Sequence, residues 1–279
     1  MKYPNNYIYI HKNTKMSNEN LYDKKVLFVF GDSWTNNLYV DKPKKHWCYL
    51  LKQKLNYDYV VNISDDYDSN YEIFDCVKKT LSDNDYPMKQ QKWLKNLREF
   101  KVVVDWSTPM RDSTSVAKMY SPYNLATIPD LNSKEPNTKL WLDYVDKWFR
   151  IEMYSYDTQK RILFLQEFFN HNKIDWYMFM GFTPLVEKQF HDTEYDLRKW
   201  IDKKRFLFLN GFPNNMQDYL ITTLDKSFQK DIHINEMQFE NDRHRYFDNE
   251  VFTSDGHPNI KGFELMSDII YRSFFDAIS

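Results

Sequence analysis

The sequence predicts an α/β fold built around a central parallel sheet of about five strands. Short, nearly continuous apolar runs recur along the chain, and amphipathic segments with helical periodicity lie between them. An apolar run without alternation is typical of a strand buried on both faces, and strands that alternate with helices favour parallel pairing with right-handed crossovers. With 279 residues, of which 42% are hydrophobic, the chain can bury a large core without disulfides.

The first half of the chain is expected to follow the order βαβαβ. The predicted strands are residues 25–30 (KVLFVF), 57–63 and 101–106. The predicted helices are residues 44–56 and 69–81, each with apolar side chains along one stripe. Ser69 is a good N-cap for the second of these helices. Residues 1–24 are polar and are expected to form an irregular N-terminal arm.

The second half is expected to be less regular and to end in a helix. Residues 112–137 contain three prolines and predict a loop. Further elements are expected at 138–171 (helix), 173–181 (strand), 184–204 (helix), 205–209 (strand) and 259–277 (helix), and 211–250 receive no assignment. Residues 25–279 are therefore expected to be one domain with an insertion around 112–160.

Composition excludes several classes of protein. Lys and Arg number 38 against 40 Asp and Glu, so the net charge of -2 argues against a general nucleic-acid binder. Cys48 and Cys76 are too few for a disulfide framework or a tetrahedral metal site, and both are expected to be buried free thiols. No apolar run approaches the ~20 residues of a membrane span, and residues 1–20 hold no apolar signal-peptide core. We therefore expect cytoplasmic synthesis without a signal peptide.

A serine follows the first predicted strand directly, in Phe30-Gly31-Asp32-Ser33. Ligands of open parallel sheets bind at the carboxyl ends of the strands, so Ser33 is placed where a nucleophile would be. Gly31 allows a sharp turn, and a backbone N–H after such a turn can point at a developing oxyanion. Taken alone, the tripeptide Gly31-Asp32-Ser33 can equally be a chance turn.

A second segment, Ser254-Asp255-Gly256-His257-Pro258-Asn259, precedes the terminal helix. A serine hydroxyl needs a base to take its proton, and His257 can be that base. Asp255 can then orient the imidazole and stabilise the imidazolium. This segment alone can also be turn chemistry with Asn259 as a helix cap, but the two segments together favour a Ser, Asp, His triad.

This arrangement resembles the SGNH (GDSL-like) hydrolase family. The resemblance spans about 255 residues from Lys24 onward, and its specific blocks are VFGDSWT and SDGHPNIKG. It implies a flavodoxin-like three-layer α/β/α sandwich and hydrolysis of esters, often acyl or acetyl groups on carbohydrates or lipids. It also implies Ser33 as the nucleophile, Asp255 and His257 as its partners, and no metal or organic cofactor.

The middle blocks depart from the family pattern. Residues 62–70 lack the glycine whose N–H lines the family's oxyanion hole, and the strand ending at 104–111 lacks the family's Asn. Candidate substitutes as oxyanion donors or substrate contacts are Ser64, Ser107, Thr108 and Arg111, the last of which can also bind an anionic group. Trp34 can either stack on a sugar or pack in the core.

The resulting prediction is a serine esterase acting on an ester, most readily an O-acyl or O-acetyl carbohydrate. Its expected partner is a small-molecule or polysaccharide ester, with no nucleic acid and no membrane. The alternative is a weak or inactive member of the same fold with a binding or structural role. An AT-rich coding bias, the polar arm and the diverged blocks would suit such a protein in a phage, associated with the virion. A nucleotide-binding flavodoxin-like domain is disfavoured because no Gly-rich phosphate loop follows the first strand.

Overall fold

A computed structural model describes residues 7–10, 21–36, 42–64, 69–83, 90–109, 151–186, 188–226 and 246–276. Within these residues six parallel strands form one sheet in the order β1-β3-β2-β4-β5-β6. The strands are β1 (Tyr7–Ile10), β2 (Lys25–Gly31), β3 (Tyr59–Ser64), β4 (Glu99–Trp106), β5 (Asp175–Met180) and β6 (Phe206–Leu207).

The strand order places a topological switch point at β2. Without β1, the order β3-β2-β4-β5-β6 is the 2-1-3-4-5 order of doubly wound flavodoxin-like sheets. The chain passes from β2 to β3 on one side and then crosses back to β4 on the other. The carboxyl end of β2 is therefore the position at which such sheets bind ligands.

The edge strand β1 was not expected, because residues 1–24 were predicted to be irregular. Its four residues, Tyr-Ile-Tyr-Ile, pair in register with Val60 to Ile63 of β3. Aromatic and β-branched residues suit a strand, and the paired edge supplies the partner groups that a short isolated strand lacks. The sheet thus has one strand more than the five predicted.

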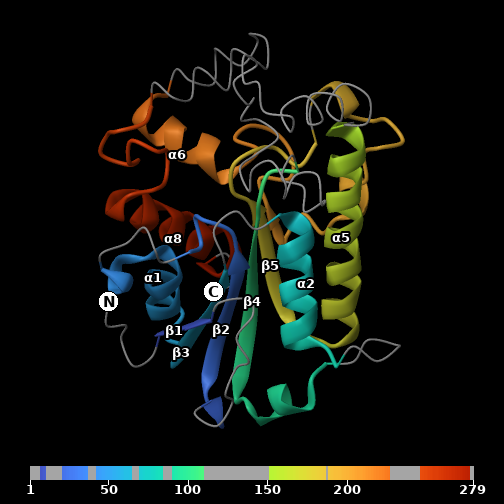
Figure 1. The fold of residues 1–279 in the computed structure, drawn as a ribbon, viewed down its shortest axis with the longest axis vertical. Coiled ribbons are helices and arrows are strands. Elements are labelled where there is room, and N and C mark those ends of the chain that lie inside the picture. Colours follow the sequence, from blue (N-terminus) through green and yellow to red (C-terminus); the bar gives the residue numbers. More distant parts are fainter. Residues whose placement is uncertain are drawn as a thin grey trace, which may run out of the picture.

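Helices cover both faces of the sheet and complete three layers (Figure 1). One face carries α1 (Trp47–Lys54), α6 (Met216–Leu224) and α8 (Ile260–Phe274), and the other carries α2 (Asn70–Leu81) and α5 (Ile151–His171). Alternate side chains of β2 enter the two cores, Leu27 and Val29 on the α8 side and Phe28 and Phe30 on the α5 side. The predicted α/β sandwich is confirmed.

The helix boundaries follow from local capping. Ser69 forms a capping box with Glu72 at the start of α2, as its residue type predicts. Asn259 accepts from the backbone of Lys261 and Gly262 and so begins α8. Residues 44–46, expected to be helical, instead belong to a short 3-10 turn, Pro43–Lys45, and its cap. A second 3-10 turn, Lys92–Asn96, precedes β4.

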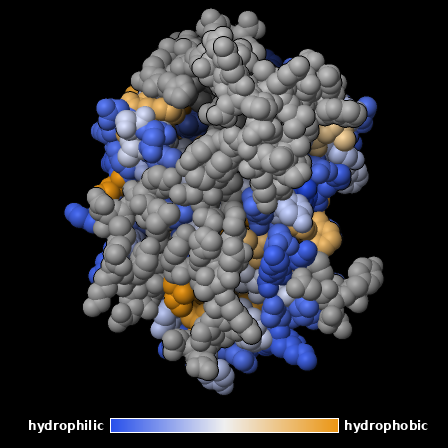
Figure 2. Space-filling model, in the orientation of Figure 1, coloured by the Kyte–Doolittle hydropathy of each residue, from blue (hydrophilic) through white to orange (hydrophobic). Residues whose placement is uncertain are grey.

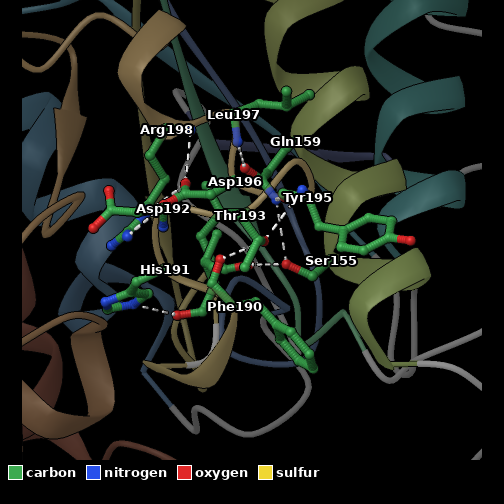
Figure 3. Close-up of polar contacts among 12 residues, drawn as sticks. Ser155, Gln159, Phe190, His191, Asp192, Thr193, Tyr195, Asp196, Leu197 and Arg198 are labelled. Carbon is green, nitrogen blue, oxygen red and sulfur yellow. Dashed lines mark hydrogen bonds and ion pairs between the residues drawn. The ribbon is translucent and has the colours of Figure 1, made fainter.

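The prediction of a helix over 184–204 is wrong. This segment contains turns and two 3-10 turns, Lys188–Phe190 and Arg198–Trp200. Two buried glutamines of α5 hold it in place. Gln159 donates to Tyr195 O (2.8 Å) and accepts from Leu197 N (2.6 Å), as Figure 3 shows, and Gln166 bonds Trp200 O and Asp202 N in the same pattern. Each glutamine side-chain amide bonds a backbone carbonyl and the backbone N–H two residues further along. These backbone groups of the loop therefore have hydrogen-bond partners without being part of a helix.

The remaining expectations concern the terminal helix, the two cysteines and the loop at 112–137. The terminal helix is confirmed, with Phe263, Ile270 and Phe274 buried, and Cys48 and Cys76 are buried free thiols. The predicted loop at 112–137 lies outside the described residues, so the boundaries of the insertion remain a prediction. No described helix has both the length and the apolar character needed to cross a membrane. The described surface in Figure 2 is mainly hydrophilic, with small separate apolar areas.

Candidate active site

Gly31 leads β2 into a tight turn that carries Ser33. A Cβ at Gly31 would lie 2.3 Å from Thr35 Oγ1, so only glycine fits there without displacing the turn. The turn is closed by Asp32, whose carbonyl accepts from Thr35 N (3.0 Å) and Asn36 N (2.9 Å). Asp32 Oδ1 also accepts from Trp34 N (3.1 Å). This local network places Ser33 just beyond the carboxyl end of β2, at the switch point.

The Ser33 side chain is buried, with 3% of the residue exposed. Its Oγ has no hydrogen-bond partner within the described parts of the chain. Buried hydroxyls normally have a partner, and one that lacks it is a group to be explained. The unengaged Oγ is consistent with a hydroxyl that meets its partner only when a ligand or a shifted base arrives.

Asp255 and His257, the predicted partners of Ser33, lie within ion-pair distance of each other. His257 Nδ1 lies 3.2 Å from Asp255 Oδ2, and Thr253 Oγ1 donates to the other carboxylate oxygen, Oδ1. Burial by itself would raise the pKa of Asp255, but the bond from Thr253 and the charge of His257 hold it below its ordinary value. Asp255 is therefore ionised at neutral pH, as an orienting partner of a histidine must be.

Glycine at position 256 is required by the geometry of this loop. Its φ is +80°, in the left-handed region, and a Cβ there would lie 2.6 Å from Phe247 Cζ. The Thr253 backbone N–H donates to the His257 carbonyl (2.8 Å), which closes the loop. The Asp255–His257 pair is thus fixed by short-range contacts.

The two motif segments lie next to each other. The Trp34 ring packs against Phe252 with 6.1 Å between ring centroids, and Phe252 pairs with Pro258 in an antiparallel bridge. Trp34, which follows Ser33, therefore contacts Phe252. Phe252 in turn pairs with Pro258, which follows His257. No hydrogen bond joins Ser33 Oγ to His257 in this structure. The assignment of the three residues as a triad remains a prediction.

The other candidate residues occupy different positions. Trp34 is fully buried and packs edge-on against Phe182 (4.6 Å), so it is a core residue rather than a sugar platform. Ser64 is buried, and its hydroxyl donates to Asn62 Oδ1 (2.8 Å). Thr108 is also buried, with 7% exposed, and Arg111 lies outside the described residues.

Ser107 is the candidate donor whose surroundings best fit the role. It follows the end of β4 and is completely buried, and its Oγ has no partner in the described part of the chain. β2 pairs with β4 as far as Phe30 opposite Val104, so the segments that carry Ser33 and Ser107 leave the sheet from the carboxyl ends of neighbouring strands. Two unengaged hydroxyls therefore lie at the carboxyl ends of neighbouring strands.

Asn70 belongs to the same edge of the sheet but was not singled out from the sequence. Its amide nitrogen donates to Ser107 O (3.0 Å) and to Thr158 Oγ1 (3.2 Å) and so joins α2, the end of β4 and α5. Both amide protons are engaged, so Asn70 cannot supply the missing oxyanion donor in this arrangement. Asn70 is the first residue of the helix after a strand, and this position in the sequence could have indicated that it lies near the carboxyl edge of the sheet.

Groups of three or more His, Cys, Asp or Glu side chains with metal-binding geometry do not occur in the described ranges. The absence of a metal or organic cofactor stays a prediction.

Comparisons with known proteins give a distant likeness. No family model and no curated protein matches the chain. A solved lipolytic protein of the G-D-S-L family from Veillonella parvula DSM 2008 is 14% identical, with a TM-score of 0.36 over 90% of this chain and 98% of that one. A proposed lipolytic G-D-S-L protein from Desulfitobacterium hafniense DCB-2 is 10% identical, with a TM-score of 0.24 over 55% of this chain and 76% of that one. At these TM-scores the likeness assigns neither family nor activity.

Proposed function

We propose that this protein is a serine hydrolase of the SGNH type that cleaves an ester. The observations that support the proposal are the close approach of His257 to Asp255 and, separately, a buried Ser33 hydroxyl that makes no hydrogen bond at the switch point of the sheet. A nucleophile, a base and an orienting carboxylate are the three groups that acyl transfer by serine requires.

The proposed reaction has two steps. Ser33 Oγ attacks the ester carbonyl carbon while His257 takes the hydroxyl proton, and Asp255 stabilises the imidazolium. The tetrahedral intermediate expels the alcohol, which receives the proton from His257, and an acyl group remains on Ser33. Water then attacks this acyl-enzyme with His257 again as the base, and the carboxylic acid leaves.

The oxyanion would need donors that differ from the family's usual ones. The Trp34 N–H, directly after the nucleophile, is already engaged by Asp32 Oδ1. We assign the role to the Ser107 hydroxyl, which is buried just beyond the carboxyl end of β4 and makes no hydrogen bond to a described residue. Thr108 and Arg111 are further candidates. Because loss of one oxyanion donor costs ~10²–10³ in kcat, a hydrolase with a reduced set of donors would be slow.

The proposed substrate is an O-acyl or O-acetyl group on a carbohydrate. This part of the proposal is supported by the resemblance of the two motif segments, VFGDSWT and SDGHPNIKG. A screen of acetylated sugars against simple aryl esters would test it, and a preference of the enzyme for the aryl esters would contradict it.

Labelling with a fluorophosphonate tests the central claim. The intact mass of the wild type should increase by one adduct, and Ser33→Ala and His257→Ala should remain unlabelled. Ser254→Ala is the matched control, because this serine belongs to the same motif but is exposed. Labelling of Ser33→Ala to the wild-type level would assign the reactive group elsewhere.

A second candidate function is a binding or structural role on the same fold. The specific observation in its favour is that Ser33 Oγ makes no hydrogen bond to His257. A folded wild type that forms no adduct at any pH between 6 and 9 would favour this function. Association with a virion would then be tested by co-purification with virus particles from infected cells.

A further inference from the structure

Asp105 is a completely buried carboxyl group beneath the Ser33 turn. It lies near the end of β4, between Gly31 of β2 and Gly181, which follows β5. A Cβ at Gly31 would lie 2.9 Å from Asp105 Cβ, and a Cβ at Gly181 would lie 2.8 Å from Asp105 Oδ1. Two of the five glycines in the chain therefore border this one side chain and leave it room.

Asp105 is linked to the turn through Thr35. Thr35 Oγ1 donates to Asp105 Oδ2 (2.9 Å), and Thr35 O accepts from Asn62 Nδ2 (2.6 Å). Asn62 Oδ1 in turn accepts from the Ser64 hydroxyl (2.8 Å). This chain of four buried residues, which we call the turn support, joins the carboxyl ends of β4, β2 and β3. Thr35 is also part of the turn itself, through its N–H to Asp32 O.

Stability alone does not account for the turn support. A buried carboxyl group carries a large desolvation cost, and apolar residues of similar volume commonly stabilise a core at least as well. Asp105 lies among core residues of β4, because Val103 is fully buried on the same face of the sheet and Val104 and Trp106 are fully buried on the opposite face. A polar network at this depth therefore indicates a requirement on geometry, because it fixes one arrangement of the backbone that carries Ser33.

We propose that Asp105 is a positioning residue that acts through Thr35 to hold the turn bearing Ser33. The expected effect of Asp105 on the reactivity of Ser33 rests on the proposed function, but its expected effect on the order of the turn does not. Asp105 makes no hydrogen bond to the Ser33 hydroxyl, so it orients the nucleophile rather than taking part in proton transfer. A small displacement of a nucleophile is costly, since a shift of ~1 Å can reduce a rate by ~10²-fold.

The first test measures the rate at which folded protein is labelled by a fluorophosphonate. Thr35→Val removes the donor and Asp105→Leu removes the acceptor, and both should be labelled ~10–100-fold more slowly than the wild type. Thr35→Ser keeps the hydroxyl and should restore labelling to near the wild-type rate. The double variant should be no slower than the slower single variant, because one contact has been lost in each case. Labelling of Thr35→Val at the wild-type rate would overturn the proposal.

The second test is independent of activity. Hydrogen exchange at the amides of Thr35 and Asn36, which are bonded to Asp32 O, reports the order of the turn. Exchange there should be faster in Thr35→Val and Asp105→Leu and unchanged in Thr35→Ser, while exchange in α8 remains at the wild-type rate.

The two measurements separate the possible failures. If the wild type is not labelled but the turn loses protection as expected, the proposed hydrolase function fails and the turn support stands. If protection of the turn is unchanged in both variants, or is lost equally throughout the protein, the positioning role is refuted whatever the wild type does.

Discussion

His46 offers a sensitive test of the packing between α1 and α8. It lies directly before α1, is fully buried, and its ring packs on Phe263 with 4.6 Å between centroids. Nδ1 accepts from the Cys48 N–H (3.4 Å), which places the proton of the neutral ring on Nε2. Burial lowers the pKa of His46 from 6.5 to about 3, against an opposing contribution from the Trp34 backbone.

The depressed pKa gives a definite sign and size. The unfolded chain takes up the proton first, so stability from neutral His46 is complete above pH 6.5 and is lost as the pH falls toward 3. At pH 5 the expected loss is about 2 kcal/mol, and the full difference between the two pKa values corresponds to about 5 kcal/mol. The first figure is a large part of the ~5–15 kcal/mol that stabilises a typical domain.

The assay compares urea unfolding of the wild type and His46→Asn at pH 7.5 and pH 5, followed by tryptophan fluorescence. Asparagine is a good N-cap and retains an acceptor for Cys48 N, but it does not titrate. The wild type should lose about 2 kcal/mol more than the variant between the two pH values. Carboxyl groups and the other histidines titrate in both proteins, so they cancel in this difference. Equal losses in the two proteins would show that His46 is not held neutral.

Three further predictions concern other contacts. Gln159→Leu should cost about 1–3 kcal/mol by leaving Tyr195 O and Leu197 N without their partner, whereas exposed Gln53→Leu should change urea stability by less than about 0.5 kcal/mol. Asp175→Asn should cost about 1–3 kcal/mol, because Lys101 and Arg205 both bond this carboxylate. Burial alone would raise the pKa of Asp175, but these two cations hold it below its ordinary value. The wild type therefore loses the stability from this ionised carboxylate as the pH falls below about 4, and Asp175→Asn should lose less stability over the same pH range. Gly256→Ala should lower the thermal midpoint more than Gly211→Ala, since φ is similar (+80° and +84°) but only Gly256 faces Phe247; equal shifts would refute the clash.

The parts of the fold that the sequence predicts well are those decided by local pattern. Residues 25–30 and 101–106 contain short apolar runs, VLFVF and VVV, and both are central strands with a buried interior. Ser69 and Asn259 act as caps through contacts within three residues. The segment 184–204 was mispredicted because its backbone is satisfied by Gln159 and Gln166, which lie up to 38 positions away in the sequence. An apolar periodicity cannot reveal such a contact.

In the candidate site too, the sequence predicts contacts between near neighbours in the chain but not contacts between distant residues. Asp255 and His257 are two positions apart, so their spacing in the sequence already predicts that they can interact. Thr35 and Asp105 are 70 positions apart, and only the pairing of β2 with β4 brings them together. The sequence signal for Asp105 was a single acidic residue at the end of the apolar run KVVV, which is compatible with many roles.

The two halves of the proposed site are held by different sets of local contacts. The Ser33 turn is held by Asp32 and the turn support, and the Asp255–His257 pair is held by Thr253. Among the described residues, Trp34 and Phe252 connect the halves through tilted aromatic packing. An aromatic contact has a broad energy minimum and tolerates small displacements that a hydrogen bond would not. If Ser33 and His257 form the proposed triad, we therefore expect substitutions at Trp34 or Phe252 to change the rate of labelling of Ser33 more than they change the local contacts of either half.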